Sequence, residues 1–261
     1  MKEPTFARYI GIHYSGAETR ESHLRPLRVY AADAGDPPVE VPPSYGKQNW
    51  TRQTLAEWLA QALVGDVPTA VGIDHAFSFP LAWFEKYRLP PDWRLFLEDF
   101  CRHWPTGERY TYVDFVLDGH CGDIRARHGH PDWLRLTEQR IPHRPSLFQF
   151  DRPRSIAKAT HAGLPWLRLL AQEMSSRLHV WPIDGWECPP GKSFLAEVHP
   201  PLFAARWPRA QRSPHQHAAY ATAAWLQATS NTAEWSTVTH PNLNAETERI
   251  ARIEGWTLGV L

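Results

Sequence analysis

Short apolar runs that stop at a polar side chain recur along the chain. Residues 8–14 alternate weakly and end at Ser15-Gly16, which is typical of a strand entering a turn. Further strands are predicted over residues 27–32, 69–74, 178–183 and 193–199, and the proline-rich residues 37–43 allow only an edge strand. This pattern predicts a sheet assembled from segments that are far apart in the sequence.

Helical periodicity alternates with these strands. In residues 51–63 the apolar positions share one face, which predicts an amphipathic helix. Residues 164–178 and 245–253 also favour helices, and Ser213 and Pro214 mark the start of another that runs to 228. Strands that alternate with helices predict an α/β fold with a mixed sheet flanked by helices.

Residues 81–151 show neither periodicity and are dense in Trp, Arg, His and Pro. We interpret them as an insertion or lid within a single domain over residues 1–261. The tryptophans of the chain favour anchors in a core and in loops over platforms for stacked bases.

Composition narrows the setting of the protein. The 28 basic and 28 acidic residues cancel, so only a local basic patch could attract nucleic acid. No apolar run approaches the roughly 18 residues of a membrane span, and no signal region precedes the first strand. Three widely spaced cysteines indicate reduced thiols, and we expect a cytoplasmic protein without a membrane partner. The oligomeric state has no signal in the sequence.

Three polar side chains, His13, Asp74 and Glu197, stand where predicted strands stop. Reactive groups gather at strand ends in open α/β sheets. Two carboxylates at one edge repel unless a cation neutralises them, and a divalent metal is the usual solution. The alternatives are an Asp74 that only accepts hydrogen bonds from its turn and a Glu197 that ends an exposed strand.

Other polar residues offer weaker signals. Lys158 and His161 lie before a predicted helix, where they could bind phosphate or could be a solvated lysine and a capping histidine. Ser15 could donate to phosphate or only form its turn. His120 and Cys121, with two nearby histidines, lack the compact paired ligands of structural zinc sites, so a reduced loop cysteine is the preferred interpretation.

Five segments carry a resemblance to a known family. They are Gly11-Ile-His-Tyr-Ser-Gly16, Val71-Gly-Ile-Asp-His-Ala-Phe-Ser-Phe-Pro80, Lys158-Ala-Thr-His-Ala-Gly-Leu-Pro-Trp166, Glu197-Val-His-Pro200 and His215-Gln-His-Ala-Ala-Tyr220. In this order the chain resembles an uncharacterised bacterial family, a domain of unknown function, whose members are predicted RNase H-like nucleases. The resemblance implies an RNase H-like mixed five-stranded sheet with acids on the first strand, the fourth strand, a later strand and the last helix.

Asp74 and Glu197 match two of these acidic positions, whereas His13 replaces the first-strand acid. The helix offers His215 and Ala218 instead of acids. His215, and not His217, is the better substitute for a missing acid, because it lies three positions from 218 and such positions are neighbours on a helix. Mg²⁺ prefers oxygen ligands, while imidazole suits Zn²⁺ better than Mn²⁺. We therefore expect a single divalent metal (Mg²⁺ or Mn²⁺, with Zn²⁺ as the alternative) at His13, Asp74, Glu197 and His215.

Two functions follow from this resemblance. The first is a metal-dependent nuclease in which a metal-bound water attacks phosphorus and Lys158 steadies the nucleic-acid backbone. The second is a catalytically inactive RNase H-like module that binds nucleic acid or a protein partner. Phosphotransfer, as in actin-like and sugar-kinase-like folds, ranks last because 15 glycines leave little room for their phosphate loops.

Overall fold

Seven strands form one mixed sheet in the computed structural model of the chain, which describes residues 6–43, 46–120 and 125–261. They are β1 (Arg8–His13), β2 (Arg28–Asp33), β3 (Val39–Glu40), β4 (Thr69–Ile73), β5 (Leu178–Val180), β6 (Ser193–Val198) and β7 (Thr257–Leu258). Their order is β3-β2-β1-β4-β6-β5, and β7 pairs with β6. The α/β class with a mixed sheet is confirmed, with seven strands instead of five.

The sheet has an antiparallel part and a parallel part. Strands β1, β2 and β3 form an antiparallel meander, whereas β4 pairs in parallel with both β1 and β6. Strands β5 and β7 also run parallel to β6. β5 ends at Val180, short of the predicted 183, and the two residues of β7 are too few to show a period. As a result, β1, β4 and β6 end at the same edge of the sheet.

Helices cover both faces of this sheet. They are α1 (Arg52–Val64), α2 (Leu81–Tyr87), α3 (Trp93–His103), α4 (Val113–Leu117), α5 (Leu136–Gln139), α6 (Ala157–Glu173), α7 (Pro214–Thr229), α8 (Ala233–Thr239) and α9 (Ala245–Glu254), with 3₁₀ turns η1 (Pro200–Leu202) and η2 (Ala204–Arg206). A capping box starts α7 at Ser213, as the sequence predicts. Helix α6 begins at Ala157 instead of 164, with Pro165 in its interior.

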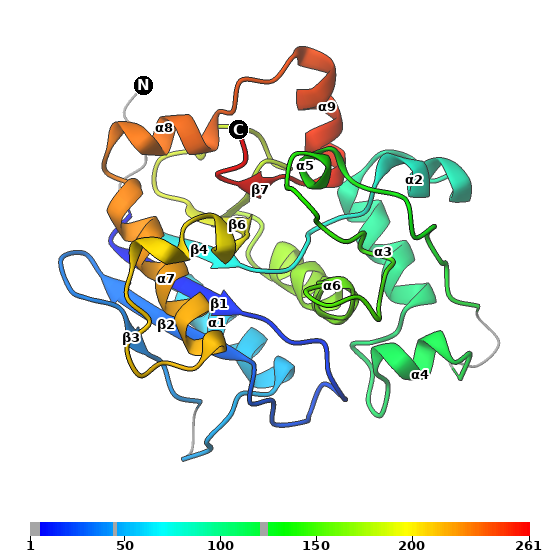
Figure 1. Cartoon of the computed structure of the whole chain (residues 1–261), viewed down its shortest axis with the longest axis horizontal. Helices are drawn as coiled ribbons and strands as arrows, with labels where there is room; N and C mark the ends of the chain where they lie inside the picture. The colour runs from blue at the N-terminus through cyan, green and yellow to red at the C-terminus, as the bar shows by residue number, and fades with distance from the viewer. Residues whose placement is uncertain (1–5, 44–45, 121–124) are drawn as a thin grey trace.

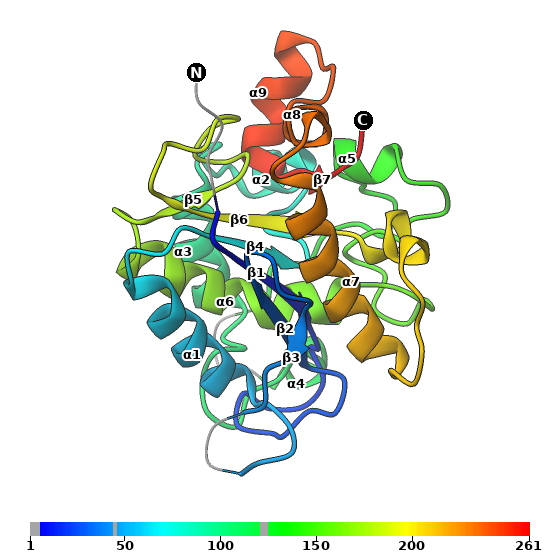
Figure 2. The same ribbon diagram turned by 90° about the vertical axis from the view of Figure 1, so that its left-hand side faces the viewer.

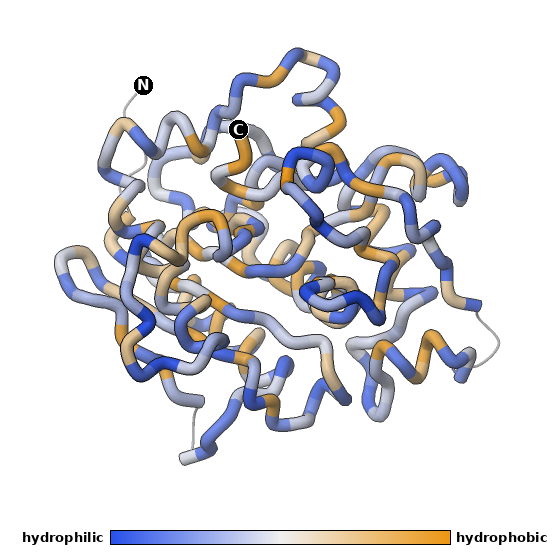
Figure 3. Tube along the Cα trace, viewed as in Figure 1, coloured by the Kyte–Doolittle hydropathy of each residue, from blue (hydrophilic) through white to orange (hydrophobic). Residues whose placement is uncertain are grey.

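The two faces of the sheet have separate cores. Helices α1, α3 and α6 lie on one side, and α7 lies on the other (Figures 1 and 2). Ile12, Val71 and Leu195 belong to the first core, while Phe194 and Ala196 belong to the second. Hydrophobic residues, orange in Figure 3, recur along the strands and the inner helices. Alternation along each strand therefore decides on which side of the sheet a functional side chain lies.

Residues 81–151 are more ordered than their sequence predicts. They contain α2, α3, α4 and α5, and their aromatic side chains pack around Phe79 and His161 in the first core. Asp92 caps α3, and Phe96 and Phe100 are buried on one face of that helix. The prediction that the tryptophans anchor a core is confirmed for Trp83, which is buried.

No helix in the described ranges is long and apolar enough to cross a membrane.

Helix α7 approaches β1 closely because the strand has glycine at its centre. A Cβ atom placed on Gly11 would overlap the carbonyl oxygen of Ala219 and lie 2.6 Å from the backbone nitrogen of Ala223. A neighbouring Cβ on Gly72 would lie 2.6 Å from a methyl group of Thr222. This contact sets the position of the first turn of α7 above the end of β1.

Substitution of Gly11 tests the role of this contact. We expect Gly11→Ala to lower the free energy of unfolding by about 3 kcal/mol or more, because the methyl group meets helix backbone that cannot move aside. Urea unfolding followed by circular dichroism measures the change.

Gly65→Ala is the matched control, since no atom lies within 4 Å of the place that a Cβ on Gly65 would take, and its φ angle is −67°. It should be neutral or stabilise by up to about 1 kcal/mol. Equal effects of the two substitutions would contradict the importance of the helix contact.

Candidate functional site

Three of the predicted site residues meet at the ends of β1 and β4. His13 is the last residue of β1, Asp74 follows β4, and His215 lies in the first turn of α7. Nδ1 of His13 is 2.7 Å from Oδ2 of Asp74, and Nε2 of His13 is 2.6 Å from Nδ1 of His215. The three side chains form a line with the imidazole of His13 in the middle.

The surroundings of this line decide where a positive charge resides. Burial opposes charge on His13, but the Asp74 carboxylate outweighs it and raises the pKa of His13. Burial also opposes charge on Asp74, yet His13 and the Tyr14 N–H, which donates to Oδ1 at 2.6 Å, lower the pKa of this carboxyl. The pKa of His215 is lowered by burial and by the charge of His13. A proton shared by the two imidazoles is therefore held on His13.

This arrangement can move a proton over the length of two rings. When Nδ1 of His13 carries a proton beside the Asp74 carboxylate, Nε2 accepts from His215, whose own Nε2 is then free to take a proton. A proton taken up at His215 passes the charge to His13, where Asp74 stabilises it. The chemistry that this chain can supply is general acid–base catalysis.

Glu197 lies at the neighbouring strand end but on the other side of the sheet. It is opposite Ile73 in the β4–β6 register and shares a face of β6 with Leu195, and both of these residues belong to the first core. Asp74 comes one position after Ile73 and contacts His13 on the side of α7. The structure thus brings together His13, Asp74 and His215, and it does not bring Glu197 to them.

Arg135 occupies both oxygens of Glu197. Its Nη1 and Nη2 donate to Oε2 and Oε1 at 2.7 Å each, and the hydroxyl of Thr257 donates to Oε1 at 2.9 Å. Arg135 also contacts Glu138 and the Glu254 carbonyl. Burial alone would raise the pKa of Glu197, but the guanidinium lowers it. Glu197 is 1% exposed, so it does not end an exposed strand either.

The donor geometry does not fit the predicted divalent metal. His13 directs its two ring nitrogens to opposite neighbours, so Asp74 and His215 do not converge with it on one point. In the part of the chain that the structure describes, no three His, Cys, Asp or Glu side chains are placed to hold a metal ion. Cys121 of the weak zinc pattern lies outside the described residues. We derive no step through a metal.

The predicted substrate-binding residues have other partners in the structure. Lys158 forms an ion pair with Asp114 at 2.6 Å, and Ser15 accepts from the N–H of Ala17, as a turn residue does. His161 is fully buried, and Nδ1 bonds to the Ala157 carbonyl. Burial lowers the pKa of His161 to about 3. His161 is therefore a neutral core histidine, and neither substrate contact nor helix capping describes it.

Sequence reasoning missed the cations that line this edge. Arg135 and Arg144 come from residues 81–151, where no periodicity indicated a structural role. Nη1 of Arg144 lies 2.5 Å from Nδ1 of His199, just after β6. The position of Glu197 at the end of a predicted strand was the signal in the sequence, and it did not identify the arginine partners.

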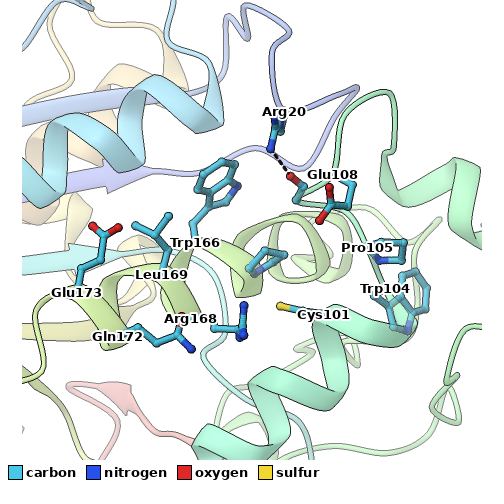
Figure 4. A pocket seen from close by; sticks show the side chains of 12 residues that line it. Arg20, Cys101, Trp104, Pro105, Glu108, Trp166, Arg168, Leu169, Gln172 and Glu173 are labelled. Carbon is cyan, nitrogen blue, oxygen red and sulfur yellow. Dashed lines mark hydrogen bonds between the residues drawn. The ribbon is translucent and has the colours of Figure 1, made fainter.

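A separate groove of about 310 Å³ lies between α3 and α6. Figure 4 shows the thiol of Cys101 and the guanidinium of Arg168 facing each other there, with the indole of Trp166 on the opposite wall. Burial raises the pKa of the Cys101 thiol to about 11, so it is not a nucleophile at neutral pH. None of the predicted site residues lines this groove.

Comparison with known proteins gives no further assignment. The chain matches no protein-family model, no curated protein and no solved structure. The resemblance to RNase H-like nucleases therefore stays a prediction from its motifs.

Replacement of His161 tests its neutral burial. Its lowered folded pKa means that stability is present above pH 6.5 and lost as the pH falls, because the unfolded chain takes up the proton. We expect His161→Phe to reduce the loss of unfolding free energy between pH 7.5 and 5 by about 2 kcal/mol. Urea titrations at both pH values measure this difference. The exposed His130, as His130→Gln, should leave it unchanged, and an unchanged loss in His161→Phe would refute the assignment.

Replacement of Arg135 tests the buried ion pair. We expect Arg135→Met to cost about 3–5 kcal/mol of unfolding free energy, because it leaves Glu197 buried without a counter-ion. Arg135→Met with Glu197→Met should recover much of that loss. Arg206→Met removes an exposed pair with Glu234 and should cost less than about 1 kcal/mol. A double variant no more stable than Arg135→Met would show that the unpaired Glu197 charge is not the main cause of the lost unfolding free energy.

Proposed function

We propose that the protein is an RNase H-like domain that hydrolyses phosphodiester bonds of nucleic acid through imidazole acid–base catalysis. The line of Asp74, His13 and His215 at the shared end of β1 and β4 is the observation that carries this proposal. The order β3-β2-β1-β4-β6, with an antiparallel meander joined to parallel strands, supports the RNase H-like part. The nucleic-acid substrate follows from the motif resemblance.

In the proposed reaction, Nε2 of His215 removes a proton from the attacking water as its oxygen bonds to phosphorus. His215 passes its Nδ1 proton to Nε2 of His13, and Asp74 stabilises the resulting imidazolium. The bond between phosphorus and the leaving oxygen breaks, and the relayed proton returns to that oxygen. The products are a phosphate monoester and a hydroxyl group.

A catalytically silent module that binds nucleic acid or a protein partner is the second candidate. The observation that favours it is the saturation of Glu197 by Arg135, because this acid is closed to both substrate and metal. Under this alternative the His13–Asp74 pair only stabilises the sheet edge.

A cleavage assay separates the two candidates. Single-stranded and double-stranded DNA and RNA and an RNA–DNA hybrid are incubated with the protein in EDTA, Mg²⁺, Mn²⁺ or Zn²⁺. We expect cleavage that persists in EDTA and falls about 100-fold or more in Asp74→Asn and in His215→Gln. The rate should rise with pH through an apparent pKa above 6.5, because His13 must be neutral to accept the relayed proton and its pKa is raised.

His217→Gln is the matched control, because position 217 on the same helix turn points away from His13. Burial and the arginines of the preceding loop lower the pKa of His217. It should cleave like the unaltered protein. Cleavage that vanishes in EDTA would contradict the imidazole mechanism. Binding of labelled oligonucleotides without cleavage under every condition would favour the silent module.

A further inference from the structure

Arg144 is one of three arginines buried within the described ranges, and it differs from the other two. Arg52 donates to three backbone carbonyls, and Arg135 donates to two glutamates. Arg144 is 9% exposed, and its side-chain contacts are to the ring of His199. Its Nε and Nη2 atoms have no hydrogen-bond partner among the residues that the structure describes. Two of the three guanidinium nitrogens of Arg144 therefore lack a hydrogen-bond acceptor in this part of the structure.

The acids around Arg144 attract its charge, but each of them is paired with another residue. Asp74 is bound by His13, while Glu197 and Glu138 are bound by Arg135. Burial outweighs the attraction of these acids and lowers the pKa of Arg144. A guanidinium keeps its proton even so, and a buried cation without a bound anion is unfavourable. In the chain without ligand, Nε and Nη2 of Arg144 are thus buried without an acceptor.

The free atoms have the geometry that oxyanions use. Nε and Nη2 lie along one edge of the planar guanidinium and form the fork that binds two oxygens of a phosphate or carboxylate. The partner of Arg144, His199, follows β6 directly, so the guanidinium stands at the sheet edge where β4 also ends. Asp74 follows β4 at this edge as His199 follows β6, so the fork and the His13 line stand at the same end of the sheet.

We propose that Arg144 is the phosphate-binding residue of the His13–Asp74–His215 site and holds two phosphoryl oxygens through Nε and Nη2. This inference rests on the proposed function and names the group of the substrate that the site recognises. Both nitrogens are covered in the ligand-free chain, so an incoming phosphate must draw the guanidinium toward the surface and away from His199, which contacts Nη1. His199 is suited to release it, because burial and the Arg144 charge keep its imidazole neutral.

Calorimetric titration with inorganic phosphate tests the proposal on the full chain. We expect the dissociation constant to rise at least tenfold in Arg144→Met, and less in Arg144→Lys, which keeps the charge but loses the fork. Arg140→Met is the matched control, because Arg140 is an exposed arginine stacked on Trp256 a few residues earlier, and it should bind phosphate like the unaltered protein. Malonate, a dicarboxylate, should bind more weakly than phosphate. A 5′-phosphorylated and an unphosphorylated oligonucleotide tell a terminal phosphate from a backbone phosphate.

Thermal unfolding gives a readout that a purely structural arginine would not give. Without phosphate, Arg144→Met should unfold at the same or a higher temperature, because it removes two buried nitrogens that have no hydrogen-bond acceptor among the described residues. Phosphate should raise the unfolding temperature of the unaltered protein and not that of this variant. A destabilised Arg144→Met that binds phosphate normally would overturn the inference, as would the absence of phosphate binding by the unaltered protein.

These outcomes are independent of cleavage. Phosphate binding that depends on Arg144 in a protein that does not cleave would leave the inference standing and remove the proposed hydrolysis. Cleavage that depends on His215 but not on Arg144 would do the opposite.

Discussion

The buried ion pair between Arg135 and Glu197 holds together three parts of the chain that the sequence separates. Arg135 comes from the region between β4 and α6, Glu197 ends β6, and Thr257 and the Glu254 carbonyl complete the set of contacts. Neither charge is stable alone in a dry interior, so each of the three segments packs stably only when the other two are in place. Residues 81–151 therefore contribute to the charge balance of the fold.

The same edge of the sheet handles its second acid differently. Asp74 faces α7 and pairs with His13, whereas Glu197 faces the opposite core and pairs with Arg135. Side-chain cations thus neutralise both carboxylates, one with an imidazole that can exchange its proton and one with a guanidinium that cannot. This contrast is why the proposed chemistry is centred on the imidazoles. The close approach of α7 to β1, which Gly11 permits, is what brings His215 within reach of His13.

Local patterns predicted the elements whose signals are local. The strands that became β1 and β4, the amphipathic α1 and the capped start of α7 all agree with their sequence ranges. The meeting of His13 and Asp74 was predicted because parallel strands end together. The separation of Asp74 from Glu197 was not, because a one-residue difference in register changes the face of a side chain and register between distant strands leaves no trace in the sequence. Arg135 is 62 residues from its partner and precedes α5, whose four residues are too few to show a period.

The order in which these contacts can form has a consequence for biosynthesis. A ribosome releases residue 135 and residue 197 well before residues 254 and 257, so the nascent chain must carry an arginine and a glutamate whose remaining partners do not yet exist. Until that segment emerges, water has to solvate Arg135 and Glu197, and the place that α9 later occupies beside the sheet has to stay open. Translation speed over the last helix should then influence how much of the protein reaches its native state in the cell.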